Sequence, residues 1–225
     1  MSKAIVVLSG GQDSATCLAL AKSKHEHVEA IIFEYGQRHA VEIDCAVELC
    51  EKWGVPFNII NVGALKQVST SALLNTKDDV GKEHPLKPGL PASFVPARNA
   101  IFLTLAHARA QSIGADTIYT GVCQTDYSGY PDCRQQFIYN LTLTLNAGYE
   151  SNIDIVTPLM NVTKAETFRM ADGLGVLGDI VEHTHTCYEG DRTQKHLWGY
   201  GCGECPACKL REKGWLEYSD SVARA

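Results

Sequence analysis

Four cysteines toward the C-terminal end of the sequence have the spacing of metal ligands. Cys202, Cys205 and Cys208 are separated by two C-x-x-C intervals, and Cys187 precedes them to give C-x14-C-x2-C-x2-C. Thiolates are soft donors that favour zinc, and four of them close a tetrahedral site. We therefore expect a structural Zn2+ with no position open to a substrate. A histidine in place of Cys187 remains an alternative, with these candidates: His183, His185 and His196.

A second chemical motif, SGGQDS (Ser9–Ser14), lies between a short apolar run at 4–8 and a helical pattern at 13–24. Glycines let the backbone approach an anion closely, and a helix N-terminus offers unpaired N–H groups. Asp13 is placed to hold a metal ion or to cap the helix, and an ordinary strand-to-helix turn is the alternative interpretation. No lysine follows the glycines, so the loop is not a Walker loop.

Three further polar segments contain candidate binding residues. The segment 121–134 follows a predicted strand and is rich in polar side chains: Asp126, Tyr127, Ser128, Tyr130, Asp132 and Arg134. An aspartate there could accept hydrogen bonds from a guanine-like edge, although a solvated turn has the same composition. The other two segments, 94–99 and 156–166, contribute Arg98 and Lys164 where helices begin.

Strand-like and helix-like patterns alternate along the chain and predict the scaffold for these residues. Strands are expected at 4–8, 28–35, 57–62, 116–122 and 153–159, and helices at 13–24, 38–53, 97–113, 133–148 and 163–175. This alternation predicts an α/β fold with a parallel sheet and helices on both faces. The segment 75–96 has little periodicity and is expected to be a loop that is mobile or covers the substrate.

Composition limits the class of protein. The chain has 225 residues, a formal net charge of -6 and a hydrophobic fraction of 45%. The acidic balance argues against direct nucleic-acid binding, and the lack of a long apolar run argues against a membrane span. We expect a cytoplasmic protein, in which Cys17, Cys45 and Cys50 are reduced core residues on helices.

The hexapeptide SGGQDS matches the signature of the pyrophosphatase loop, and the order of the other motifs is specific. YGQRH (35–39), VPARN (95–99), GVCQTDYSGYPDCR (121–134), TKAE (163–166) and the cysteines together resemble the 7-cyano-7-deazaguanine synthase family of queuosine biosynthesis. Two positions depart from the family pattern: Glu34 stands where aspartate is more common, and Ala97 where glycine is.

This resemblance implies a Rossmann-like (adenine nucleotide α-hydrolase-like) domain over 1–182 and a zinc-binding segment over 183–225 packed on it. The implied activity is an ATP-dependent ligase that converts 7-carboxy-7-deazaguanine and ammonia into the nitrile, with Mg2+ at the phosphates and a homodimer as the assembly. Asp13, Ser14, Arg98 and Lys164 are the implied catalytic residues. ATP is expected at Leu8, Ser9, Gly10, Gly11, Gln12, Asp13, Ser14, Phe33, Tyr35, Gln37 and Arg38. The deazaguanine is expected at Arg98, Tyr130, Asp132 and Arg134.

Two other functions would account for parts of the sequence. Another pyrophosphatase-loop ligase that modifies or thiolates tRNA would need a basic RNA-binding extension and a reactive cysteine pair. A non-enzymatic zinc-ribbon module would explain the C-terminal cysteines but would give SGGQDS no role. Such a module would bind nucleic acid with a steep dependence on salt.

Overall fold

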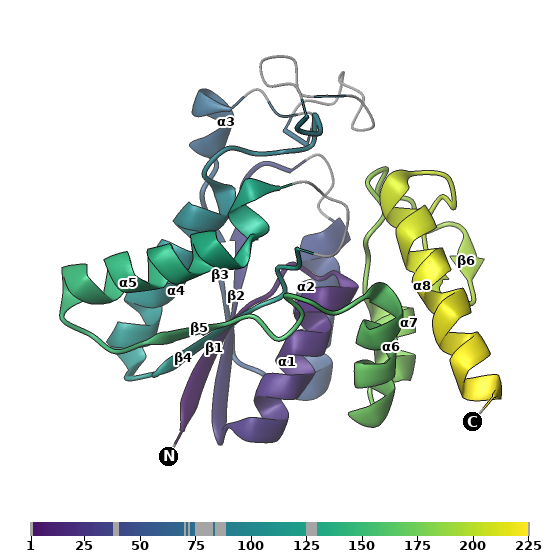
Figure 1. Ribbon diagram of the computed structural model, residues 1–225, viewed down its shortest axis with the longest axis horizontal. Helices are drawn as coiled ribbons and strands as arrows, with labels where there is room; N and C mark the ends of the chain where they lie inside the picture. Colours follow the sequence, from purple (N-terminus) through teal and green to yellow (C-terminus); the bar gives the residue numbers. More distant parts are fainter. Residues whose placement is uncertain are drawn as a thin grey trace.

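A five-stranded parallel sheet forms the centre of the molecule (Figure 1). The computed structural model describes residues 2–37, 41–69, 71, 73–74, 83, 89–124 and 130–224. The order of the strands is β3-β2-β1-β4-β5, and every pairing within this sheet is parallel. The strands are β1 (Lys3–Val7), β2 (His27–Glu34), β3 (Phe57–Asn61), β4 (Thr117–Thr120) and β5 (Asp154–Val156).

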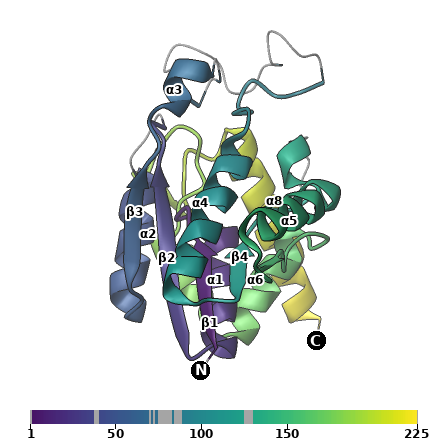
Figure 2. The ribbon, with the colours of Figure 1, turned by 90° about the vertical axis from the view of Figure 1, so that its left-hand side faces the viewer.

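Helices cover both faces of the sheet, as the alternating pattern predicted (Figures 1 and 2). Neighbouring residues of β1 point to opposite faces, since Val6 packs in one core cluster with Leu18 and Ile5 in the other with Phe102. Such double-sided burial is why strands of this kind are continuous apolar runs. The described helices are α1 (Gln12–Lys24), α2 (Val41–Trp53), α3 (Leu65–Val68), α4 (Arg98–Ile113), the 3-10 turn η1 (Pro131–Cys133), α5 (Gln135–Tyr149), α6 (Lys164–Gly173), α7 (Leu177–His183) and α8 (Pro206–Ala223).

Two predicted strands end at least two residues earlier in the structure than the sequence pattern suggested. The strand expected at 116–122 ends at Thr120, and Gly121 after it packs so closely on the start of α1 that a Cβ there would lie 2.9 Å from the Ser14 nitrogen. The strand expected at 153–159 ends at Val156, shortly before Pro158, which has no N–H for a ladder. The expected covering loop at 75–96 lies mostly outside the described residues, of which it contains 83 and 89–96.

The C-terminal segment packs on the same core as one face of the sheet. The α8 helix lies against α6, where the rings of Phe168 and Trp215 meet edge to face at 5.2 Å between centroids. A short antiparallel hairpin, β6 (Lys195–His196) and β7 (Gly199–Tyr200), precedes α8. The division of the chain at 182/183 remains a prediction. No helix in the described part of the chain is long and apolar enough to cross a bilayer.

The strand order places a crevice above the carboxyl ends of β1 and β4. From β1 the chain moves outward through β2 and β3, whereas β4 lies on the opposite side of β1. Open α/β sheets bind ligands at such a switch point. The SGGQDS loop leaves β1 at this position. Cys17, Cys45 and Cys50 are fully buried in their helices, as expected.

Candidate active site and metal centre

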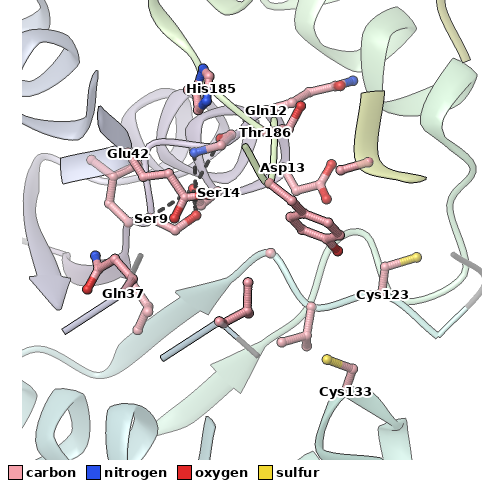
Figure 3. A pocket seen from close by; sticks show the side chains of 18 of the residues that line it. Ser9, Gln12, Asp13, Ser14, Gln37, Glu42, Cys123, Cys133, His185 and Thr186 are labelled. Carbon is pink, nitrogen blue, oxygen red and sulfur yellow. Dashed lines mark hydrogen bonds between the residues drawn. The ribbon is translucent and has the colours of Figure 1, made fainter. Parts of the chain in front are cut away.

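A cavity of about 650 Å³ opens at the switch point of the sheet. The ends of β1, β2 and β4 form its floor, and the first turns of α1, α2, α4, α6 and α8 and the segment 185–188 form its walls. Figure 3 shows Ser9, Glu42 and Gln37 on one side of this cavity, Asp13 on another, and Cys123 with Cys133 across from them. Helix N-termini therefore surround the space, which favours an anionic ligand.

The loop between β1 and α1 is held in shape by its own serines (Figure 3). The Ser9 N–H donates to Ser14 Oγ at 3.1 Å, and Ser14 Oγ donates to the Gly11 carbonyl at 3.2 Å. Gly10 has φ +82°, and a Cβ there would overlap the Glu42 carbonyl. Gly11 is the N-cap of α1 and no side chain caps the helix, so the alternative in which Asp13 is the cap is wrong. The first turn of α1 thus has backbone N–H groups without a side-chain cap.

Asp13 and Lys164 form an ion pair at the mouth of this loop. Lys164 Nζ donates to Asp13 Oδ2, and Asp13 Oδ1 is buried with no hydrogen-bond partner among the described residues. The position of Lys164 is fixed by a capping box, in which the Thr163 N–H donates to Glu166 Oε2 at 2.8 Å. Gly214 of α8 packs so closely that a Cβ there would overlap Lys164 Cβ. The lysine is therefore held from two sides.

An aromatic shelf and a buried arginine line the far side of the cavity. The rings of Phe33 and Phe102 stack in parallel with centroids 4.1 Å apart. The Arg98 guanidinium lies 5.8 Å from the ring centres of both Tyr35 and Tyr130. Burial alone would lower the pKa of Arg98, but Tyr35, Tyr130 and Asp132 outweigh it and raise the pKa above its ordinary value. Arg98 is a cation throughout the physiological range.

Asp132 lies behind Arg98 and binds the start of α4. Its Oδ2 accepts a hydrogen bond from the Asn99 N–H at 3.3 Å, while Oδ1 is buried without a partner among the described residues. Burial raises the pKa of Asp132, with Arg98 and Asn99 acting in the opposite direction. One oxygen of Asp132 thus accepts a hydrogen bond from the first turn of α4, and the other oxygen has no hydrogen-bond partner among the described residues.

Glu42, in the first turn of α2, is a second carboxylate of the cavity. Burial raises its pKa to about 7, although Arg98 lowers it. A carboxylate with this pKa exchanges its proton near neutral pH, where a general acid or base is most effective.

The four C-terminal cysteines come together in a single group. All four Sγ atoms lie within 4.8 Å of one another, and the Cys202–Cys208 and Cys187–Cys205 sulfur pairs are 3.9 and 4.0 Å apart. The backbone N–H groups of Glu204 and Cys205 point at Cys202 Sγ, at 3.4 and 3.3 Å. Four soft donors at this separation fit a tetrahedral metal ion.

None of the three candidate histidines belongs to this sulfur group. The side chain of His183 contacts Glu48 at 2.8 Å, and the ring of His196 stacks on Trp198 with centroids 4.3 Å apart. His185 is buried, and its backbone N–H donates to the Gly10 carbonyl at 2.9 Å. Cys187 is the fourth member of the group.

Comparison with known proteins places the chain in a family. A family model described as "Queuosine biosynthesis protein QueC" matches residues 3–219. The chain belongs to the QueC family. It is 52% identical over 222 residues to a 7-cyano-7-deazaguanine synthase of Wolinella succinogenes, covering 98% of this chain and 95% of that protein. Proteins of the same name from Helicobacter pylori (47% over 215 residues, 95% and 94% covered) and Clostridium botulinum (48% over 216 residues, 96% and 95% covered) are also similar.

Solved structures share the fold at low sequence identity. A 4-thiouridine synthetase in complex with RNA and ATP matches with a TM-score of 0.54 and 15% identity over 97% of this chain. The chain spans about half (51%) of that protein's length. A predicted tRNA methyltransferase subunit of Methanocaldococcus jannaschii matches with a TM-score of 0.50 and 18% identity, covering 76% of this chain and 75% of that one. These likenesses concern the fold alone.

Most residues predicted to contact ATP in this QueC-family chain line the cavity. These lining residues are Leu8, Ser9, Gly11, Gln12, Asp13, Ser14, Phe33, Tyr35 and Gln37. The catalytic candidates Arg98 and Lys164 also line the cavity. Gly10 is not among the lining residues, and its φ of +82° sets the turn of the loop. The amide of Gln37 accepts from the Tyr35 N–H at 2.9 Å and so closes the turn after β2. Arg38 lies outside the described residues.

The residues predicted to contact the deazaguanine do not all line the cavity. Tyr130 lines the cavity, and its hydroxyl lies 2.7 Å from Ser93 Oγ. Asp132 is buried and Arg134 is exposed, and neither is among the lining residues. Asp126, Tyr127 and Ser128 lie outside the described residues. The substrate roles of Tyr130, Asp132 and Arg134 remain predictions.

Sequence reasoning missed several lining residues of this QueC-family cavity. Glu42 gave no signal, because a glutamate in the first turn of a helix is common for electrostatic reasons alone. Tyr188 was overlooked although it follows Cys187; it lines the cavity, and burial raises its pKa far above the ordinary value, with Tyr130 adding to the effect. The adjacency of Tyr188 to a metal-type cysteine was the available clue.

Proposed function

We propose that this chain is an ATP-dependent ligase that converts 7-carboxy-7-deazaguanine and ammonia into 7-cyano-7-deazaguanine. The observation that carries the proposal is similarity over nearly the whole chain to relatives named 7-cyano-7-deazaguanine synthase. A cavity that combines an uncapped helix N-terminus with two cations, Lys164 and Arg98, supports it. Such a cavity suits a nucleotide triphosphate and a carboxylate substrate.

The chemistry must turn a carboxylate, which is a poor electrophile, into a nitrile. A carboxylate oxygen attacks the α-phosphorus of ATP, the bond to the β-phosphate oxygen breaks, and pyrophosphate leaves. Ammonia then attacks the acyl carbon, AMP leaves with the C–O bond electrons, and a proton is released. The amide oxygen attacks a second ATP in the same way. Loss of AMP and of the two N–H protons forms the C≡N bond, so two ATP yield two AMP and two pyrophosphates.

The phosphate loop has the groups to hold ATP through both activations. Backbone N–H groups at the start of α1 and the hydroxyls of Ser9 and Ser14 are donors for the phosphates. Lys164 and Arg98 are placed to stabilise the charge that builds up at the α-phosphorus, by electrostatic preorganisation. The unpartnered Oδ1 of Asp13 is the oxygen available to Mg2+, which would neutralise charge on the phosphates.

The two faces of the cavity suggest where the two substrates bind. The shelf of Phe33 and Phe102, next to Tyr35, offers an apolar surface to adenine. Tyr130 offers a second ring. The unpartnered Oδ1 of Asp132, which is not among the lining residues but is adjacent in sequence to Cys133 of the lining, is the proposed acceptor for the amine edge of deazaguanine. In this arrangement Arg98, beside both Tyr35 and Tyr130, lies between base and nucleotide.

The cysteine group is proposed to bind a structural Zn2+, which supplies stability and takes no part in bond making. Cys187 and Tyr188 are adjacent, so a metal at the cysteines fixes one wall of the cavity. The family resemblance also implies a homodimer. Light scattering coupled to gel filtration tests the dimer, and metal analysis of the purified protein tests the zinc.

The decisive assay uses ATP, Mg2+, ammonium and 7-carboxy-7-deazaguanine with zinc-replete protein. Mass spectrometry is expected to show the nitrile together with AMP. Omitting ammonium is the matched control, in which exchange of labelled pyrophosphate into ATP continues but no nitrile forms. Absence of both exchange and nitrile would contradict the proposed function, and exchange without nitrile in the complete mixture would point to a different acceptor.

A further inference from the structure

Arg211 is the largest of the fully buried side chains in the described part of the chain, with an exposed fraction of 0%. It belongs to α8 and follows Cys208 by three residues, so both lie on one face of the helix. Burying a guanidinium is costly unless a negative charge compensates it. The environment of Arg211 therefore has to contain such a charge when the protein is in its working form.

The hydrogen bonds of Arg211 go to neutral acceptors. Its Nη2 donates to the Ile180 carbonyl at 2.9 Å and to Thr184 Oγ1 at 2.8 Å, and its Nη1 lies 3.5 Å from Thr186 Oγ1. Nε is buried and has no partner among the described residues. Within that same part of the chain, no aspartate or glutamate oxygen lies within 4.0 Å of the guanidinium.

The surrounding backbone fixes the guanidinium where it is. Gly199 has φ +120°, and a Cβ there would lie 2.8 Å from Arg211 Nη2. The absence of that Cβ makes room for the guanidinium, and the bonds to Ile180 and Thr184 hold it against the end of α7. These contacts fix the position of the Arg211 guanidinium.

Three sources of negative charge act on the Arg211 guanidinium. Asp13 of the phosphate loop has the largest effect, followed by Cys208 and Cys45, whereas Arg192 repels the guanidinium. Asp13 is already paired with Lys164. Four thiolates around one divalent zinc carry a net charge of minus two, and one of them, Cys208, is three residues before Arg211 on the same helix.

From this arrangement we infer that Arg211 is a positioning residue, whose charge balances the metal-bound cysteine thiolates. Its effect extends to the phosphate loop, because the segment it holds, 184–186, donates the His185 N–H to the Gly10 carbonyl at 2.9 Å. Arg211 therefore joins the metal centre to the catalytic loop. This role is independent of which substrate the enzyme uses.

The test measures zinc rather than catalysis. Arg211→Met, Arg211→Lys, Thr184→Val and, as a matched control, Arg109→Met are purified in the zinc-loaded form. Arg109 bonds Glu29 through its guanidinium, with Nε 2.7 Å from Glu29 Oε1, away from the cysteines. Release of zinc to a chromogenic chelator is expected to be at least about 10-fold faster for Arg211→Met, as for other residues that support metal ligands. The variants Arg211→Lys, Thr184→Val and Arg109→Met retain the local charge and are expected to stay within a few-fold of the unmodified protein.

A second measurement separates charge from packing. In cobalt-substituted protein the thiolate-to-cobalt absorption band is expected to shift in Arg211→Met and to return in Arg211→Lys. Zinc release from Arg211→Met at the unmodified rate would overturn the inference, as would equally fast release from Thr184→Val. If Arg211→Met does not fold, slow release from both Arg211→Lys and Thr184→Val supports the inference, and fast release from both overturns it.

Discussion

Lys164 at the start of α6 donates a hydrogen bond to Asp13 in the first turn of α1, across 151 positions of sequence. The pair joins the SGGQDS loop to the TKAE segment. Each motif contributes one charge, and the ion pair gives the cavity a fixed cation beside the SGGQDS loop.

Replacing Lys164 with methionine is expected to slow adenylation by roughly 100- to 1,000-fold, the usual cost of losing a preorganised charge at a reacting centre. Pyrophosphate exchange in the presence of 7-carboxy-7-deazaguanine measures it directly. Lys52→Met, which removes a partly exposed partner of Asp179 on the far side of α7, is the control. Unchanged exchange in Lys164→Met would remove the lysine from the mechanism.

Asp132→Asn is expected to raise the KM for 7-carboxy-7-deazaguanine by about 10-fold or more while leaving the KM for ATP nearly unchanged. The reason is that the unpartnered Oδ1 would no longer be an anionic acceptor, and hydrogen bonds to charged groups contribute roughly 1.5–3 kcal/mol. Steady-state kinetics with each substrate varied in turn decides the matter. A parallel rise in both constants would indicate that Asp132 acts only through α4 and Arg98.

Ala97→Gly is expected to stabilise the protein by about 1 kcal/mol. Ala97 precedes α4 with φ 61°, a left-handed conformation that is costly for any residue with a Cβ. Urea unfolding gives the difference, and Ala108→Gly inside the same helix is the control, expected to lose roughly 0.5–1 kcal/mol. Loss of stability in both variants would show that the surroundings accommodate Ala97 without strain.

Cys205→Ser is expected to lower the bound zinc and the melting temperature together, by on the order of 10 °C. Metal binding at such sites is coupled to folding, and each kcal/mol shifts the melting temperature of a chain of this size by roughly 2–4 °C. Cys50→Ala, at a buried cysteine outside the sulfur group, is expected to keep its metal. Full zinc content in Cys205→Ser would contradict a four-cysteine site.

Glu42 is expected to make stability depend on pH. Its pKa in the folded protein is about 7, above the ordinary 4.5, so the folded state holds the proton more tightly than the unfolded state does. The resulting stabilisation is complete below about pH 4.5 and is lost as the pH rises through 7. Relative to Glu42→Gln, the unmodified protein should therefore lose stability between pH 5 and pH 8.

Urea unfolding of both proteins across this pH window checks the expectation. Glu51→Gln makes the same charge change on the exposed face of α2 and is the control. A constant difference between Glu42→Gln and the unmodified protein from pH 5 to pH 8 would show that Glu42 does not titrate in that window.

The sequence predicted what depends on local pattern. Apolar runs such as 4–8 gave the strands, and the alternation with helices gave the parallel sheet. The cysteine spacing predicted the sulfur group because Cys202, Cys205 and Cys208 are close together in sequence, at the start of α8 and in the turn before it. The helix α8 was missed, since Pro206 and the cysteines suggested a loop, although proline favours the first turn of a helix.

Contacts between distant segments could not be predicted from pattern. Nothing in the sequence near Asp132 indicates that one of its oxygens caps α4, or that Glu42 faces the cavity. Such relations depend on how helices pack across the sheet, which hydrophobic periodicity does not encode. The family resemblance supplied part of this knowledge by naming Arg98 and Lys164 together.

Because α8 is synthesised after all the strands of the sheet, its packing matters for how the chain folds during translation. Cys205 and Cys208 follow every strand of the sheet in the chain, and Gly214 backs Lys164 from the same helix. A nascent chain whose α8 is still inside the ribosome therefore has every strand of the sheet but lacks one wall of the cavity. It also lacks part of the core cluster that α8 shares with the sheet, so the cavity can be completed only after the last helix has emerged.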